Sequence, residues 1–203
     1  MPDRHLQRRV LVAITGASGA IYGLRLLQVL HQSATVETQL VVSPSGLTTS
    51  QHELGMDLHA LGTHAHHTHD ASDLGAGPAS GSFRCHAMVV APCSMRTLSA
   101  IAHGLSDNLV TRAADVMLKE RRRLILMARE TPLHLGHLRN MVAVTEMGAI
   151  VCPPMPAFYL KPQRIEDLVN ASVARVLDLL DLPDLAQTTS SRWAGLHTPM
   201  EAP

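Results

Sequence analysis

Aromatic residues are scarce in this sequence: two Phe, two Tyr and one Trp occur among 203 residues. The core must therefore be built mainly from Val, Leu, Ile, Ala and the ten Met residues. A flat ligand bound by such a chain would lie mostly against aliphatic side chains and backbone, because few rings are present to stack on it. The exceptions are Tyr22, Phe83, Phe158, Tyr159 and Trp193.

Further absences argue against whole classes of protein. The three cysteines, Cys85, Cys93 and Cys152, are widely spaced and form no C-x-x-C pair, so neither a disulfide framework nor a zinc site is indicated. The formal net charge is +0, which offers no broad basic surface to nucleic acid. No apolar run reaches the roughly 18–20 residues that cross a bilayer. Residues 1–9 lack the pattern of a signal peptide. We therefore expect a cytoplasmic protein that binds neither nucleic acid nor membrane.

Apolar, β-branched runs alternate with amphipathic stretches along the chain. Strands are predicted at residues 9–15, 36–43, 86–92, 123–128 and 149–153. Helices are predicted at residues 20–31, 47–54, 93–104, 107–120, 133–147 and 165–182. This alternation predicts an α/β fold with a doubly wound, mostly parallel sheet. We expect a single domain over residues 1–203, with its core at residues 9–182 and a polar tail at 183–203.

The run of residues 86–104 is the first candidate site. A buried strand ends at Pro92 and an amphipathic helix follows at once. Ser94 and Thr97 then lie beside unpaired backbone N–H groups of the first helical turn, a geometry that holds an anion or a polar ring edge. Open α/β sheets bind their ligands at such strand ends. The alternative is an ordinary turn in which Ser94 is only an N-cap, and spacing alone favours it.

A second candidate follows the first strand, in the segment TGASGAIYG at residues 15–23. Its glycines do not match the dinucleotide pattern G-x-G-x-x-G. A glycine turn between strand and helix can still cradle a phosphate or the edge of a flavin, with help from Ser18. Glycines that only allow close packing of strand and helix are an equally good interpretation. Ser43 ends the next strand, so Ser18, Ser43 and Ser94 share one sheet edge if the strands are parallel.

Six histidines crowd residues 52–69: His52, His59, His64, His66, His67 and His69. Imidazole is a common metal ligand, but these histidines show neither an i,i+4 pair with a carboxylate nor a mixed Cys/His spacing. A solvated, variable loop across residues 55–82 is the better interpretation. Its last part, residues 75–82, is expected to be flexible, and residues 80–82 within it are expected to be able to close over a ligand.

Arg129 and Glu130 directly follow the predicted strand at residues 123–128. This is the sheet edge where chemistry is expected in a parallel α/β fold. An ordinary surface ion pair is the alternative.

Several long motifs resemble those of flavin prenyltransferases of the UbiX family. They are TGASGAIYG at 15–23, APCSMRTL at 91–98, DNL at 107–109, TRAAD at 111–115, LKERR at 118–122, RETPLHLGHLRN at 129–140 and PPMPAFY at 153–159. They follow one another in the order found in that family, within residues 9–182.

The resemblance implies a flavodoxin-like or Rossmann-like three-layer sandwich. It also implies a homo-oligomer, a dodecamer built from trimers, with active sites between subunits. The implied reaction transfers a dimethylallyl group from dimethylallyl phosphate to N5 and C6 of reduced FMN, without a metal. The product, prenylated FMN, is the cofactor of UbiD-type decarboxylases, which would receive it.

The resemblance also implies site residues. By matching motifs, FMN contacts are expected at Gly16, Ala17, Ser18, Ser43, Ser94, Met95, Arg96, Thr97 and Arg129. Prenyl-phosphate contacts are expected at Tyr159 and Arg175, with Lys119 and Arg112 nearby. Fixed cations suit a departing phosphate, and a carboxylate suits the proton that leaves C6. The candidate catalytic residues are Glu130, Lys119, Glu53 and Ser18, with the phosphate itself as another proton acceptor.

One departure from the family pattern concerns Leu74, since some relatives carry a Trp there that can shield the allyl cation. Trp193 is a candidate substitute, so the rate rather than the reaction is in question. Two rival functions stay open. An FMN-dependent cysteine decarboxylase of the same fold would lack the motifs at 118–122 and 129–140. A non-catalytic flavin-binding accessory subunit would not need Lys119, Glu130, Tyr159 and Arg175.

Overall fold

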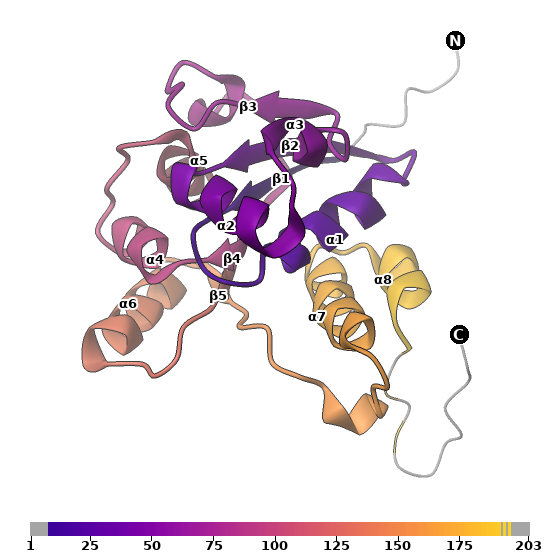
Figure 1. Cartoon of the computed structure of the whole chain (residues 1–203). Helices are drawn as coiled ribbons and strands as arrows, with labels where there is room; N and C mark the ends of the chain where they lie inside the picture. Colours follow the sequence, from indigo (N-terminus) through magenta and orange to yellow (C-terminus); the bar gives the residue numbers. More distant parts are fainter. Residues whose placement is uncertain (1–7, 192, 194, 196–203) are drawn as a thin grey trace. The chain divides into compact units, whose positions relative to one another are not determined.

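The predicted strands pair into one parallel sheet in the computed structural model, which describes residues 8–191, 193 and 195. The strands are β1 (Arg8–Ile14), β2 (Val36–Val42), β3 (His67–His69), β4 (Ala87–Cys93), β5 (Arg123–Ala128) and β6 (Ile150–Val151). Their order across the sheet is β3-β2-β1-β4-β5-β6, and each of these pairings is parallel (Figure 1). The predicted doubly wound sheet is therefore confirmed, in the strand order of Rossmann folds.

The helices are α1 (Ala20–His31), α2 (Pro44–Leu54), α3 (Leu58–Gly62), α4 (Met95–Ala102), α5 (Leu109–Lys119), α6 (Leu135–Glu146), α7 (Ile165–Leu179) and α8 (Pro183–Thr189). Short 3-10 turns lie at η1 (Gly77–Ala79) and η2 (Phe158–Leu160). No helix in this described part of the chain is long and apolar enough to cross a membrane. The chain separates into two compact units, Met1–Pro153 with the sheet and Pro154–Pro203 with η2, α7 and α8. The single-domain expectation stays a prediction.

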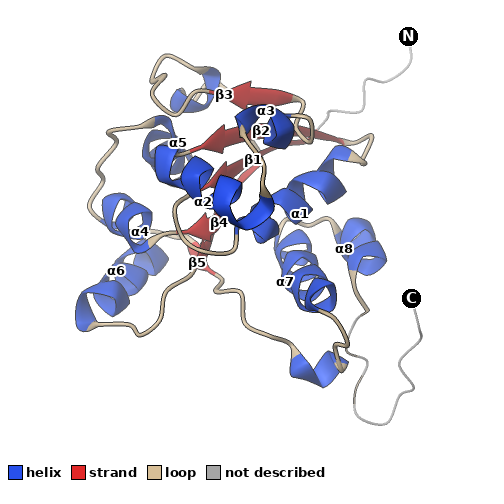
Figure 2. Ribbon diagram, in the orientation of Figure 1, coloured by secondary structure: helices blue, strands red, loops and turns tan. Residues whose placement is uncertain are grey.

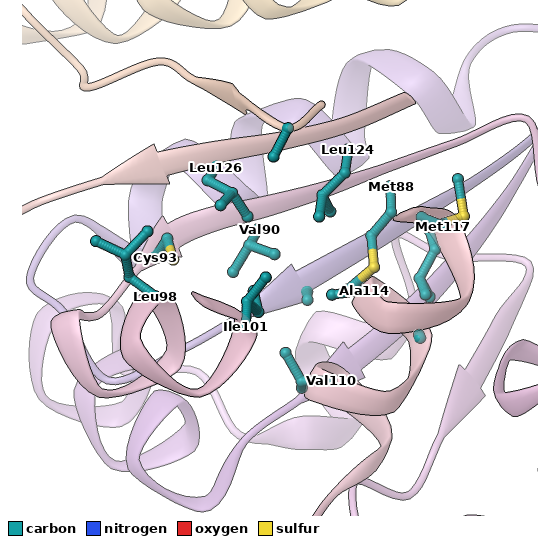
Figure 3. Close-up of a cluster of buried hydrophobic side chains, with 14 of the residues drawn as sticks. Met88, Val90, Cys93, Leu98, Ile101, Val110, Ala114, Met117, Leu124 and Leu126 are labelled. Atoms are coloured by element: carbon teal, nitrogen blue, oxygen red, sulfur yellow. The ribbon is translucent and has the colours of Figure 1, made fainter. Parts of the chain in front are cut away.

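One face of the sheet packs against α4 and α5 (Figure 3). Alternate strand residues point to this face because side chains of a strand alternate between its two sides. The buried cluster includes Met88, Val90, Leu124 and Leu126 from the strands and Leu98, Ile101, Val110, Ala114 and Met117 from the helices. The amphipathic pattern predicted a buried stripe on both helices, and both have one.

Within the first unit, α1 covers the opposite face of the sheet (Figure 2). Its approach is close at Gly23, where an added Cβ would overlap the Ala91 carbonyl oxygen and lie 2.8 Å from Ile14 Cγ1. Glycine at this position therefore lets helix and strand touch. Helices on both faces complete the expected three-layer arrangement.

Two stretches differ from the sequence-based prediction. Residues 55–82 were expected to form a loop, but they contain α3, β3 and η1. Strand β3 pairs with β2 from Gln39↔His67 to Val41↔His69. Its three residues are polar and lie at the sheet edge, so no apolar pattern in the sequence predicts this strand. The tail was expected to be only polar from residue 183, but α8 begins there, with Pro183 in its first turn and Ala186 buried.

Candidate active site

The switch point of the sheet lies between β1 and β4, where the chain stops adding strands on one side and starts on the other. Doubly wound folds bind ligands at this point, beyond the carboxyl ends of the strands. The turn after β1 and the start of α4 after β4 both open there, and Ser43 follows the neighbouring β2. The three serine-bearing strand ends expected from the sequence are thus ends of adjacent strands.

Packing and backbone conformation explain why glycine occupies particular positions in the β1–α1 turn. A Cβ at Gly16 would lie 2.5 Å from the Ser45 Cβ, so the start of α2 packs directly on this turn. Gly19 has a φ of +105°, which other residues rarely adopt. Packing explains Gly16 and Gly23, as the alternative interpretation held, yet Gly16 and Ser18 are also exposed at the switch point.

Glu53 on α2 reaches the amino end of α1. Its carboxylate accepts hydrogen bonds from Gly19 N, at 2.9 Å, and from Ala20 N, at 2.9 Å. The Ser18 side chain also hydrogen-bonds to it. Partial burial alone would raise the pKa of this carboxyl. The hydrogen bonds and the charge of Arg129 outweigh burial, and the net pKa lies below its usual value, so Glu53 is ionised at neutral pH.

The two other serines are N-caps in this structure. Ser43 Oγ accepts from Gly46 N at 3.1 Å at the start of α2, and Ser94 Oγ accepts from Thr97 N at 3.3 Å at the start of α4. Ser94 also donates to Thr97 Oγ1 at 3.1 Å. Ser94 is therefore an N-cap, and its role as a ligand contact stays a prediction; both hydroxyls lie at the expected sheet edge.

The remaining residues of the α4 motif differ in how far their side chains reach solvent. Met95 is 9% exposed and belongs to the buried cluster, so its backbone is what it presents at this edge. Arg96 is exposed and forms an ion pair with Asp107 at 2.6 Å. The helix start therefore offers main-chain groups together with one paired guanidinium.

Arg129 and Glu130 lie at the same edge, directly after β5. Arg129 N donates to the Cys93 carbonyl at 3.1 Å, which ties this residue to the end of β4. Glu130 is exposed and accepts from Thr131 N at 2.9 Å. The charge of Arg129 acts on Glu53 and on Tyr22, so both lie near it. Burial nevertheless raises the pKa of the Tyr22 phenol, which keeps it a neutral hydrogen-bonding group.

Thr15 lies at this site but was not predicted as a site residue, and Tyr22 was predicted only as one of the few rings available to a flat ligand. Thr15 is 1% exposed, and its hydroxyl bonds to both Pro92 and Ser94. Tyr22 packs beside Gly19 on the first turn of α1. Their place next to the glycine turn was a usable signal, but a threonine at a strand end and a tyrosine in a helix are common for other reasons.

Lys119 lies at the opposite edge of the sheet. Met117, two residues before the end of α5, packs beside Met88 at the amino end of β4, whereas Cys93 ends the strand at the far side (Figure 3). A Cβ at Gly81, before β4, would lie 2.8 Å from Lys119 Nζ. A seven-residue strand spans about 20 Å, so Lys119 of one chain does not reach the switch point of that chain.

The segment directly before β4 belongs to this amino edge as well, and Arg112 lies two helical turns before Lys119 on α5. Arg112 donates to the Ala79 carbonyl at 3.1 Å and pairs with Asp115 at 2.6 Å. Arg122 donates to the carbonyl of Gly81 at 2.7 Å. Residues 81–83 are thus held at the edge opposite the strand ends expected to bind FMN. Closure of residues 80–82 over a ligand at those ends of their own chain is therefore not supported.

A hollow of about 450 Å³ adjoins Lys119. It is lined by side chains of α4, α5 and the end of α6, among them Leu105, Asp115, Lys119, Glu146 and Met147. Since α6 begins just after Glu130 and ends at this hollow, the helix runs from one edge of the sheet to the other.

The second unit contains Tyr159, Arg175 and Trp193. Tyr159 and Trp193 are both exposed, and their rings meet edge to face with centroids 5.5 Å apart. Arg175 is exposed on α7. Leu74, where some relatives carry Trp, lies in the first unit and is 48% exposed. Trp193 thus packs on a residue expected to bind the prenyl phosphate.

The histidine-rich stretch forms hydrogen bonds instead of a metal cluster. His66 Nδ1 accepts from Thr38 N at 3.1 Å, and His69 Nε2 lies 2.7 Å from Gln39 Oε1. Among residues 8–191, 193 and 195, no group of three or more His, Cys, Asp or Glu is placed to hold a metal ion. The expectation of a metal-free enzyme stays a prediction.

Comparisons with known proteins agree with this geometry. The Flavoprotein family model matches residues 2–182. Flavin prenyltransferase UbiX of Escherichia coli K12 is 50% identical over 188 residues, which cover 93% of this chain and 99% of the relative. The UbiX of Thauera aromatica is 52% identical and covers 92% of this chain and 94% of the relative.

Solved structures show the same likeness. AnUbiX (PadA1) in complex with FMN and dimethylallyl pyrophosphate matches with a TM-score of 0.90 and 48% identity, covering 94% of this chain and 100% of that one. A dodecameric FMN-dependent UbiX-like decarboxylase from Escherichia coli O157:H7 matches with a TM-score of 0.89 and 45% identity, covering 92% and 100%. The FMN-dependent cysteine decarboxylase TvaF, at 20% identity and a TM-score of 0.61, shares the fold alone. Half of the residues are identical to a UbiX enzyme across nearly the whole chain, and this chain belongs to the family of UbiX flavin prenyltransferases.

Proposed function

We propose that this protein transfers a dimethylallyl group from dimethylallyl phosphate to N5 and C6 of reduced FMN. The observation that carries the proposal is that several polar and charged residues lie together at the carboxyl edge of the sheet, around its switch point: Ser18, Ser94, Arg129 and the carboxylates of Glu53 and Glu130. The family membership of the chain supports the same reaction. The product would be prenylated FMN, and a UbiD-type decarboxylase would receive it. A cytoplasmic location stays a prediction.

The switch point suits a flavin in its chemistry. Exposed Gly16 and Ser18 offer backbone and hydroxyl groups to a polar ring edge, and the first turn of α4 offers more. Arg129 supplies a positive charge for an anion such as the phosphate of FMN. We assign FMN contacts to Gly16, Ala17, Ser18, Ser43, Ser94, Met95, Arg96, Thr97 and Arg129.

Reduced FMN supplies the two nucleophilic ring positions. The chain has to stabilise the phosphate that departs from the prenyl donor, and we assign Lys119, Arg175 and Tyr159 to it, with Arg112 nearby. The proton that N5 releases on prenylation would return to the double bond of the prenyl group, C6 would attack the carbon made positive, and a base would take the proton that C6 then loses. Glu130 is the first candidate, because Glu53 is already held by three hydrogen-bond donors that lower its basicity.

The position of Lys119 supports an active site shared between subunits. In one chain it lies at the edge of the sheet opposite Arg129, so a site with both residues needs a second copy. The neighbour from Escherichia coli O157:H7 is described as dodecameric, and a similar assembly would provide such a copy.

Helix α6 offers a surface for that second copy. Only Val144 of its twelve residues is buried, and Leu135, Leu138 and Val142 are 59%, 46% and 57% exposed. Leu133 before the helix and Met147 after it are exposed as well, at 40% and 47%. A helix with an apolar face of this size needs a partner. Since α6 connects the Glu130 edge with the Lys119 hollow, a copy seated on it would lie beside both halves of the site.

Mass spectrometry of the flavin tests the proposed reaction. Purified protein incubated with reduced FMN and dimethylallyl phosphate should yield a flavin heavier by one five-carbon unit. Protein without the prenyl donor is the control. A flavin that stays bound but unchanged in mass would favour the rival function of a flavin-binding accessory subunit.

A further inference from the structure

Between β1 and β4, the regular ladder of backbone hydrogen bonds stops before the strand ends. The two strands pair from Val10↔Ala87 to Ala13↔Val90. Beyond Val90 the register of β4 with β5 also shifts. Pro92 lies in this irregular stretch and has no N–H to donate. The backbone alone therefore fixes the two strand ends only weakly, at the point where both turns of the proposed FMN site begin.

Thr15 closes this gap with its side chain. Its hydroxyl donates to the Pro92 carbonyl at 2.7 Å and accepts from Ser94 N at 2.9 Å. The Thr15 backbone N donates to the same carbonyl at 3.3 Å. The one hydroxyl thus acts as a donor, like a backbone N–H, and as an acceptor, like a backbone carbonyl. Thr15 is only 1% exposed, so water does not compete for these bonds.

These bonds connect the two halves of the proposed FMN site. Thr15 directly precedes Gly16, and Ser94 directly precedes the first turn of α4. On the face of the sheet that α1 covers, Gly23 lies so close to the Ala91 carbonyl that an added Cβ would overlap it, so the end of β4 has little room to shift toward α1. We propose that Thr15 is a positioning residue that sets the spacing between the Gly16 turn and the Ser94 turn for FMN. This inference rests on the proposed function.

The test compares Thr15→Val, Thr15→Ser and a matched control. Valine keeps the shape of threonine but removes the hydroxyl, so Ser94 N loses its hydroxyl acceptor and Pro92 O keeps only the longer bond from the backbone N of residue 15. Serine keeps the hydroxyl. Thr38→Val is the control, because Thr38 is 0% exposed in the same sheet and its hydroxyl bonds to His66 Nδ1 at 2.7 Å, away from the strand ends. FMN affinity is measured by quenching of flavin fluorescence, and folding by the Tm.

We expect Thr15→Val to weaken FMN binding about tenfold or more, and Thr15→Ser by no more than about threefold. Thr38→Val should lower the Tm to a similar degree as Thr15→Val and bind FMN as the wild type does. A merely structural role of Thr15 would move the Tm of both valine variants but would not separate their FMN affinities. Equal FMN affinities of the two valine variants would overturn the inference.

Two further outcomes are decisive. If Thr15→Val does not fold, Thr15→Cys replaces it, because a thiol of similar size is a weak donor and acceptor; FMN binding equal to that of Thr15→Ser would overturn the inference. Wild-type protein that binds no FMN would overturn the proposed function as well. Wild-type binding that Thr15→Val leaves unchanged would overturn only the role of Thr15.

Discussion

The two edges of the sheet hold their charged and polar groups in different ways. At the carboxyl edge, the contacts join residues far apart in sequence, such as Thr15 with Ser94 and Gly19 with Glu53. At the amino edge, Arg122 also reaches the distant Gly81, but Lys119 pairs with its direct neighbour Glu120, and both of these side chains are partly exposed. An exposed ion pair contributes little stability, so Lys119 can exchange Glu120 for a phosphate at small cost.

This difference indicates separate tasks for the two edges. The contacts of the carboxyl edge lie within one chain, which suits the binding of a rigid ring system. The amino edge presents a cation that is available to a neighbour. The proposed shared site fits this arrangement, because parallel strands put these two edges at opposite ends.

The largest effect is expected when the two edges are inactivated in different chains. Lys119→Ala and Glu130→Gln should each slow flavin prenylation by roughly 10²- to 10⁴-fold when present in every subunit. Coexpression of both variants with different tags should restore activity in the mixed oligomers. Random mixing leaves about a quarter of the sites with both residues intact, if two chains build each site. The measurement is the rate of prenylated flavin formation in doubly purified oligomers.

The matched control is coexpression of Lys119→Ala with the double variant Lys119→Ala, Glu130→Gln. No site in that mixture has Lys119, so its activity should stay at the level of Lys119→Ala alone. The mixed oligomers of the two single variants could instead be no more active than the average of the two pure single-variant oligomers. That result would place Lys119 and Glu130 of each site in one chain and end the shared-site proposal.

The two carboxylates of the carboxyl edge should also differ, with a smaller effect on stability than on rate. Glu53 stabilises the amino end of α1 through its charge and hydrogen bonds, so Glu53→Gln should lower the Tm by about 2–4 °C. Glu130→Gln should slow product formation and leave both the Tm and FMN binding unchanged. Thermal unfolding and the flavin mass assay together separate the two roles. Wild-type turnover of Glu130→Gln would remove Glu130 from the mechanism.

The part of this molecule that could be predicted from sequence is the part with a strong local pattern. Helix α1 at residues 20–31 and strand β5 at residues 123–128 were predicted with their observed bounds, because each has a clear apolar period. Strand β3 was missed since its residues His67, Thr68 and His69 are polar and pair only with β2. Its formation depends on a neighbour rather than on its own residues.

The candidate site shows the same limit. The serines at the strand ends were found because a serine after a buried strand is a local signal. The separation of Lys119 from Arg129 was not visible in the motifs, since a motif gives the order of residues but not the sheet edge at which each one lies. The bridge made by Thr15 depends on two strands 77 residues apart, which no local pattern reports.

The smallest effect is expected at the β2–β3 edge, where the folded state prefers a neutral imidazole. His66 Nδ1 accepts from Thr38 N, which requires an unprotonated nitrogen. Burial lowers the pKa of His66, and the nearby His31 and His67 lower it further, against an opposing effect of Glu37. The unfolded chain therefore binds more protons than the folded one as the pH falls below about 6.5, and stability is lost in that direction. Because His66 is exposed, the change in Tm between pH 7.5 and pH 5.5 that depends on it should be only about 1–2 °C.

The variant His66→Asn should remove this part of the pH dependence, since an amide oxygen can accept from Thr38 N without titrating. The control variant His59→Asn, on the exposed side of α3, should leave it intact. Equal pH dependence of the Tm in His66→Asn and the wild type would show that the β2–β3 edge tolerates a charged imidazole.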